Sequence, residues 1–94
     1  MTTSEQAVFG RAMEALEQSG MRDHADAIAR AGDDDAARHV AVARAVGALG
    51  LRPVLEHTSG ALDHLSVALD DAYSVARRLA RTASTAAYAN AIFR

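Results

Sequence analysis

The amino-acid sequence predicts an all-α protein: a small, alanine-rich bundle of four to five helices with a long C-terminal helix. Three observations support this fold class. Alanine, which has the highest intrinsic helix propensity, supplies roughly a quarter of the chain. Only one proline interrupts the sequence. Apolar residues recur at steps of three and four, the spacing that places them on one face of a helix.

The chain of 94 residues is expected to form a single domain over residues 1–94, because it is no longer than one ordinary domain. A domain this small buries only about 60–65% of the surface that its unfolded chain exposes, so its core is thin. Association with a partner would therefore add materially to its stability.

The first helix is expected over about residues 4–19. Two threonines stand three positions before Glu5 and Gln6, the spacing of a capping box, in which side chains satisfy the free N–H groups of a helix start. Gly20 then offers the left-handed conformation that ends many helices. The apolar face between these signals consists of Val8, Phe9, Ala12, Met13 and Leu16.

A second helix is expected over residues 21–31, and a third from the acidic run 33–35 to Gly50. The second segment carries aspartates early and Arg30 late, which suits the helix macrodipole, and Gly32 follows as a stop. The acidic run supplies candidate N-cap residues for the third helix. That helix is expected to turn one apolar stripe inward, made of Val40, Ala43, Val46 and Leu49.

The segment after Gly50 leaves two interpretations open. Pro53 suits the first turn of a helix, where its missing N–H costs nothing. Either Pro53 opens one long helix that passes through Gly60, or a short helix ends near Thr58 and Ser59 caps another that begins near Ala61. Because glycine lowers helix propensity, we expect a break at Gly60.

The C-terminal stretch carries the longest apolar pattern of the chain, which we call the C-terminal seam. It follows a period of 3.5 residues, as a coiled coil does, through Leu62, Leu65, Leu69, Ala72, Ala76, Leu79, Ala83 and Ala86. A helix over 61–92 would be about 48 Å long, whereas a compact chain of this size is about 32 Å across. Either the helix breaks between Arg81 and Thr85, or its end docks on a partner, which we expect. The interface residues we expect are Leu69, Ala72, Ala76, Leu79, Ala83, Tyr88 and Phe93.

The composition argues against several classes of protein. The net charge of −2 gives no strong positive field, and the absence of cysteine excludes disulfides and thiolate metal sites. The sequence has neither the pattern of a signal peptide nor an apolar run long enough for a membrane span, so we expect a cytoplasmic location. Phosphate-binding glycine motifs and a nucleophile elbow are missing, so we expect no cofactor and do not expect an enzyme.

The four histidines are the candidate ligand-binding residues, because imidazole is both a metal ligand and a general base near neutral pH. None has a second ligand one helical turn downstream, so a metal site is not expected. A small-ligand pocket, in a binding bundle or an accessory enzyme, is the alternative hypothesis. It would use His39, His57 and His64, with Glu56 and Asp63 beside them.

Arg77, Arg78 and Arg81 form the main basic cluster and support a third hypothesis, nucleic-acid binding through phosphate contacts. Asp63, Asp70 and Asp71 precede them on the same helix and would repel phosphate, so a nucleic-acid partner is not favoured. Our leading hypothesis is a non-catalytic interaction or regulatory protein. We expect it to be a homodimer, or to bind another helical protein, through its last helix.

Overall fold

The computed structural model describes the chain over residues 3–50 and 59–92, with side chains over 4–50 and 63–85. Within these ranges the chain forms four α-helices: α1 (Thr3–Gln18), α2 (Arg22–Ala31), α3 (Asp35–Gly50) and α4 (Ser59–Ile92). The all-α class and the long last helix are therefore confirmed.

The turn between α1 and α2 follows from Gly20. This residue has φ +75°, and the chain around it reverses through two backbone hydrogen bonds that satisfy the last carbonyls of α1. The N–H of Gly20 donates to the carbonyl of Glu17, and the N–H of Met21 donates to that of Leu16. This pair of bonds is the Schellman motif, which needs a left-handed residue and so selects glycine.

The start of α3 follows from Asp34, one of the three predicted N-cap candidates. Its Oδ1 accepts a hydrogen bond from the N–H of Ala37 at 3.0 Å, the contact that an N-cap side chain makes with the third residue of a helix. Gly32, at φ +54°, separates this start from the end of α2. The two local signals fix a short turn between α2 and α3.

The last helix, expected to begin near Ala61 with Ser59 as its cap, begins two residues earlier: α4 starts at Ser59 and includes Gly60 in its first turn. A first-turn residue makes no intrahelical N–H bond in any case, so glycine costs less there than in a helix interior. The helix also continues without a break through Arg81 and Thr85. The possible helix at Pro53 falls outside the described residues.

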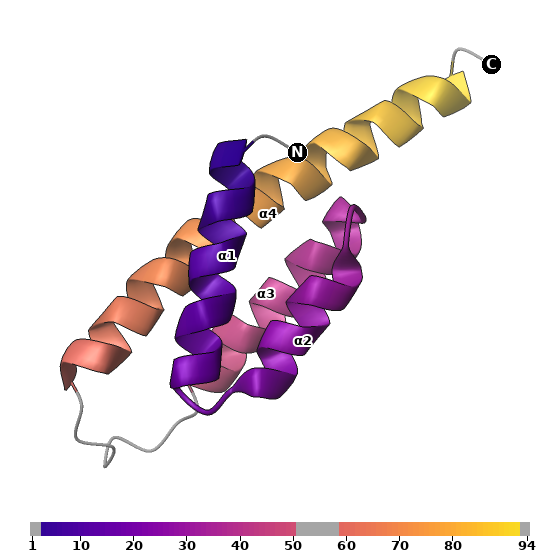
Figure 1. Ribbon diagram of the computed structural model, residues 1–94. Coiled ribbons are helices and arrows are strands. Elements are labelled where there is room, and N and C mark those ends of the chain that lie inside the picture. The colour runs from indigo at the N-terminus through magenta and orange to yellow at the C-terminus, as the bar shows by residue number, and fades with distance from the viewer. Residues whose placement is uncertain (1–2, 51–58, 93–94) are drawn as a thin grey trace.

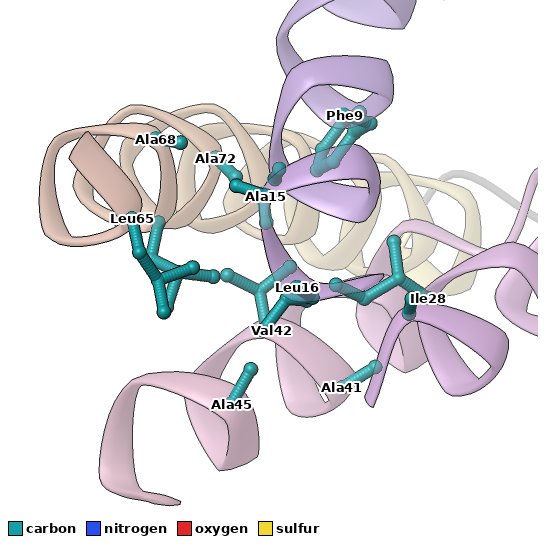
Figure 2. Close-up of a cluster of buried hydrophobic side chains, with 14 residues drawn as sticks. Phe9, Ala15, Leu16, Ile28, Ala41, Val42, Ala45, Leu65, Ala68 and Ala72 are labelled. Carbon is teal, nitrogen blue, oxygen red and sulfur yellow. The ribbon is translucent and has the colours of Figure 1, made fainter. Parts of the chain in front are cut away.

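The helices are arranged in a ring in which each packs against its neighbours in sequence, and α4 closes the ring by packing against both α3 and α1. Within the described residues, α2 makes no backbone contact with α4. The core lies inside this ring as one cluster of buried side chains. Leu16, Val42 and Leu65 point toward one another in it, from three different helices (Figure 2).

Small side chains make up much of the core. Ala12, Ala45, Ala72 and Ala76 are completely buried, beside a few large residues such as Leu16 and Leu69. Alanine buries little apolar area, so most of the hydrophobic stabilisation comes from the large side chains, at roughly 1.5–3 kcal/mol each. The core is therefore as thin as the chain length predicts.

The inward stripe expected for α3 is wrong at Val40, which is 48% exposed, whereas Val46 and Leu49 are half-buried and pack against the core. The fully buried residues of this helix are Arg38, Ala41, Val42 and Ala45. The helix is apolar on nearly every side between positions 40 and 46, so its pattern alone does not distinguish the two faces. Packing against α2 and α4 decides which face lies inside.

The molecule is elongated, with dimensions of 55 × 26 × 19 Å and a radius of gyration of 14.6 Å. A compact chain of this length would have a radius of gyration of about 12 Å. The difference comes from α4, whose C-terminal end projects past the other three helices (Figure 1). No helix in the described part of the chain is long and apolar enough to cross a membrane.

Candidate functional site

The C-terminal seam divides into two parts in the structure. Leu69, Ala72 and Ala76, three of the expected interface residues, are buried in the core of their own chain. Leu79 is half-buried and packs against the edge of that core, and Ala83 is half-buried. The first part of the seam thus holds α4 on the bundle. Only the part of the seam from Leu79 onward is accessible to a partner.

Two of the expected interface residues cannot be placed in the same way. Tyr88 belongs to the helical range of α4, but the described side chains end at residue 85. Phe93 lies outside the described residues. The sequence of this end of the chain remains strongly apolar, with alanine at 86, 87, 89 and 91 and with Ile92.

The histidines expected to share a pocket are not brought together. His39 lies half-buried between α3 and α4, with its ring centroid 5.4 Å from that of Tyr73 and the two planes tilted by 52°. His64 is exposed, and it precedes Tyr73 by nine residues on α4, which is about 13 Å along the helix axis. One small ligand would therefore not contact both imidazoles directly.

The other members of the histidine hypothesis do not complete a pocket. Asp63 is exposed on α4, and Glu56 and His57 lie outside the described residues. No group of three or more His, Asp or Glu side chains in the described part of the chain is arranged to hold a metal ion. The Nε2 atom of His39 is nevertheless buried without a hydrogen-bond partner, which is unusual for a polar atom.

The three arginines of the basic cluster do lie together. Arg77, Arg78 and Arg81 surround a shallow hollow of about 280 Å³ on α4, with Ser74 one turn earlier. Arg78 is partly neutralised, since its Nη2 donates to Glu5 Oε1 at the start of α1. Arg77 and Arg81 make no ion pair within the described residues.

A second arginine site was not predicted from the sequence. Arg38 is only 5% exposed, and its guanidinium carbon lies 4.6 Å from the centroid of the Phe9 ring. Asp35 contributes a carboxylate oxygen 3.8 Å from its Nη1. A hollow of about 290 Å³ borders this pair, lined also by Met13 and Ile28. The burial of Arg38 could have been predicted from its position one helical turn before Val42, because both residues lie on the buried face of α3.

A groove between α2 and α3 was also missed. Its floor is formed by four alanines and by Val40, and its volume is about 410 Å³. Its edges carry three groups that can be cationic, His24 and Arg30 from α2 and Arg44 from α3. The signal in the sequence was the pair of small-residue spacings Ala27/Ala31 and Ala37/Ala41, which place a flat surface on each helix.

No family model, curated protein or solved structure matches this chain.

Proposed function

We propose that this protein is a non-catalytic interaction protein that forms a homodimer through the C-terminal part of α4. One observation carries the proposal: α4 extends beyond the bundle that it helps to form, so the molecule is more than twice as long as it is wide, 55 Å against 26 Å. Figure 1 shows this end of α4 without a neighbouring helix from its own chain.

The apolar character of the projecting end supports the same proposal. The C-terminal seam continues from the core through Leu79 and Ala83, both half-buried, into a sequence that contains Tyr88 and Ile92. A helix in water is stable over such a length only when packing covers its apolar side. A second copy of α4 would provide that cover, and small residues such as Ala83 would allow the two helices to approach closely.

The thin core gives a further reason for association. A domain of this size is marginally stable by itself, and burial of additional apolar surface in a dimer would add to the free energy of unfolding. The part of the seam that lies inside the chain fixes the position of α4, so the projecting part would be presented to a partner in one defined direction.

Light scattering at micromolar protein concentration tests the proposal. We expect twice the mass of one chain, with a reversible shift toward the monomer on dilution. The variant Ala83→Glu places a charge on the seam and should raise the dissociation constant at least about tenfold. Ser84→Glu, one residue further on an exposed position, introduces the same charge and should leave the mass unchanged.

A monomer mass for the unmodified protein over the whole concentration range would refute the homodimer. If Ala83→Glu and Ser84→Glu weakened the dimer equally, the C-terminal seam would not be the dimer interface. The helical signal in circular dichroism should be the same in both variants, because neither position belongs to the buried core.

A further inference from the structure

The groove between α2 and α3 lies on the side of the molecule that α4 does not cover. Within the described residues α2 packs against α1 and α3 but has no backbone contact with α4. Ala37 and Val40, which line the groove, lie on a different face of α3 from the buried residues Val42 and Ala45. An occupant of this groove would therefore leave the proposed dimer surface free.

The floor of the groove is apolar and exposed. Val40 is 48% exposed and is one of two large hydrophobic residues in the described part of the chain that are exposed to this degree. Alanines on both sides of it leave the floor low and flat. Small side chains let a further helix approach closely, whereas an extended segment would leave its backbone groups without partners.

The groove is long enough for a helix. It continues past His24 into an adjoining hollow that Ala48 of α3 helps to line. From Ala37 to Ala48 the distance along α3 is about 16 Å, which corresponds to three turns of helix. This is the length over which amphipathic helices commonly bind in grooves, through anchors at steps of three and four.

The charges at the edges select the chemistry of the occupant. Arg30 from α2 and Arg44 from α3 border the groove, and neither makes an ion pair within the described residues. The groove around Val40 has no carboxylate in its lining, while the adjoining hollow has one, Asp23, beside Arg22. Guanidinium groups bind carboxylates through paired hydrogen bonds, so these edges complement acidic side chains.

We propose that this groove binds an acidic amphipathic helix of a partner protein. The apolar face of that helix packs on Val40 and the surrounding alanines, and its Asp or Glu side chains pair with Arg30 and Arg44. This site is independent of the homodimer proposed above, so either can fail without the other.

Binding of synthetic peptides to the full chain tests the proposal. The probe is a helical peptide with leucines on one face and glutamates beside them, compared with the same peptide carrying lysine at each glutamate. Measured by fluorescence anisotropy, the acidic peptide should bind at least about tenfold more tightly than the basic one. The double variant Arg30→Glu and Arg44→Glu should reverse this preference.

A matched control separates the groove from the overall charge. Arg11→Glu combined with Arg77→Glu changes the net charge by the same amount at two exposed positions outside the groove, and should keep the preference for the acidic peptide. Val40→Asn should weaken binding of the acidic peptide without a change of charge. Circular dichroism of each variant should match that of the unmodified chain.

Three results would overturn the proposal. The first is no saturable binding of the acidic peptide up to roughly 1 mM. The second is equal loss of binding in the control double variant, which would assign the effect to net charge. The third is a loss of self-association in Arg30→Glu with Arg44→Glu, because the groove would then be filled by a second copy of this chain.

Discussion

The guanidinium group of Arg38 lies over the ring of Phe9, 4.6 Å from its centroid. The two residues belong to α3 and α1, which face each other across the ring of helices and have no backbone contact of their own within the described residues. Both side chains are buried. The side chain of Arg38 therefore connects two helices, α1 and α3, whose backbones do not pack against each other.

Arg38→Ala should lower the free energy of unfolding by about 2 kcal/mol, because it removes a cation–π contact and uncovers the aliphatic packing around Phe9. Arg38→Met, which keeps a long apolar side chain without the charge, should lower the free energy of unfolding by less. Urea denaturation measures both. Arg11→Ala is the control, because Arg11 is exposed on α1 and should change stability by less than about 0.5 kcal/mol. An unfolding midpoint for Arg38→Ala equal to that of the control would show that the contact does not stabilise the fold.

Leu69→Ala distinguishes the two parts of the C-terminal seam. Leu69 is completely covered within one chain, so its truncation leaves a cavity and should cost about 2–5 kcal/mol at every protein concentration. Val67→Ala, two residues earlier and 60% exposed, should have almost no effect. Denaturation series at several concentrations provide the measurement. If the loss of stability caused by Leu69→Ala disappeared on dilution, Leu69 would lie at a subunit interface instead.

The existence and order of the helices could be predicted because their signals are local. Gly20, Gly32 and the acidic run at 33–35 each act on the few residues beside them, and the structure uses them as turns and caps. Ser59 was expected to cap the last helix, but α4 already includes Ser59 and Gly60, because glycine costs little in the first turn of a helix.

The candidate sites were harder to predict because they depend on residues from different helices. The three arginines were found, since they follow one another on α4, but the partner of Arg78 is Glu5, more than seventy positions earlier. The burial of Arg38 depends on a ring contributed by α1. The groove at Val40 exists only because α2 lies beside α3, which the spacing within either helix does not reveal.

Two glycine substitutions should change stability in opposite directions. Gly20→Ala forces a side chain into the left-handed conformation at φ +75° and should cost roughly 1–2 kcal/mol. Gly10→Ala lies inside α1, where an added Cβ would meet no atom within 4 Å, and should stabilise by about 0.5–1 kcal/mol. Thermal denaturation of the two variants side by side makes the comparison. A gain from Gly20→Ala would contradict the Schellman turn described above.

His39→Phe should keep or raise the free energy of unfolding, by up to about 1 kcal/mol. The Nε2 atom of His39 is buried without a hydrogen-bond partner, and an apolar ring of similar shape removes the cost of that unsatisfied atom. The ring contact with Tyr73 would remain, because phenylalanine can adopt the same tilted arrangement. His64→Phe, at an exposed position on α4, is the control and should change stability little. A cost of more than about 1 kcal/mol for His39→Phe, with little change for His64→Phe, would contradict this prediction.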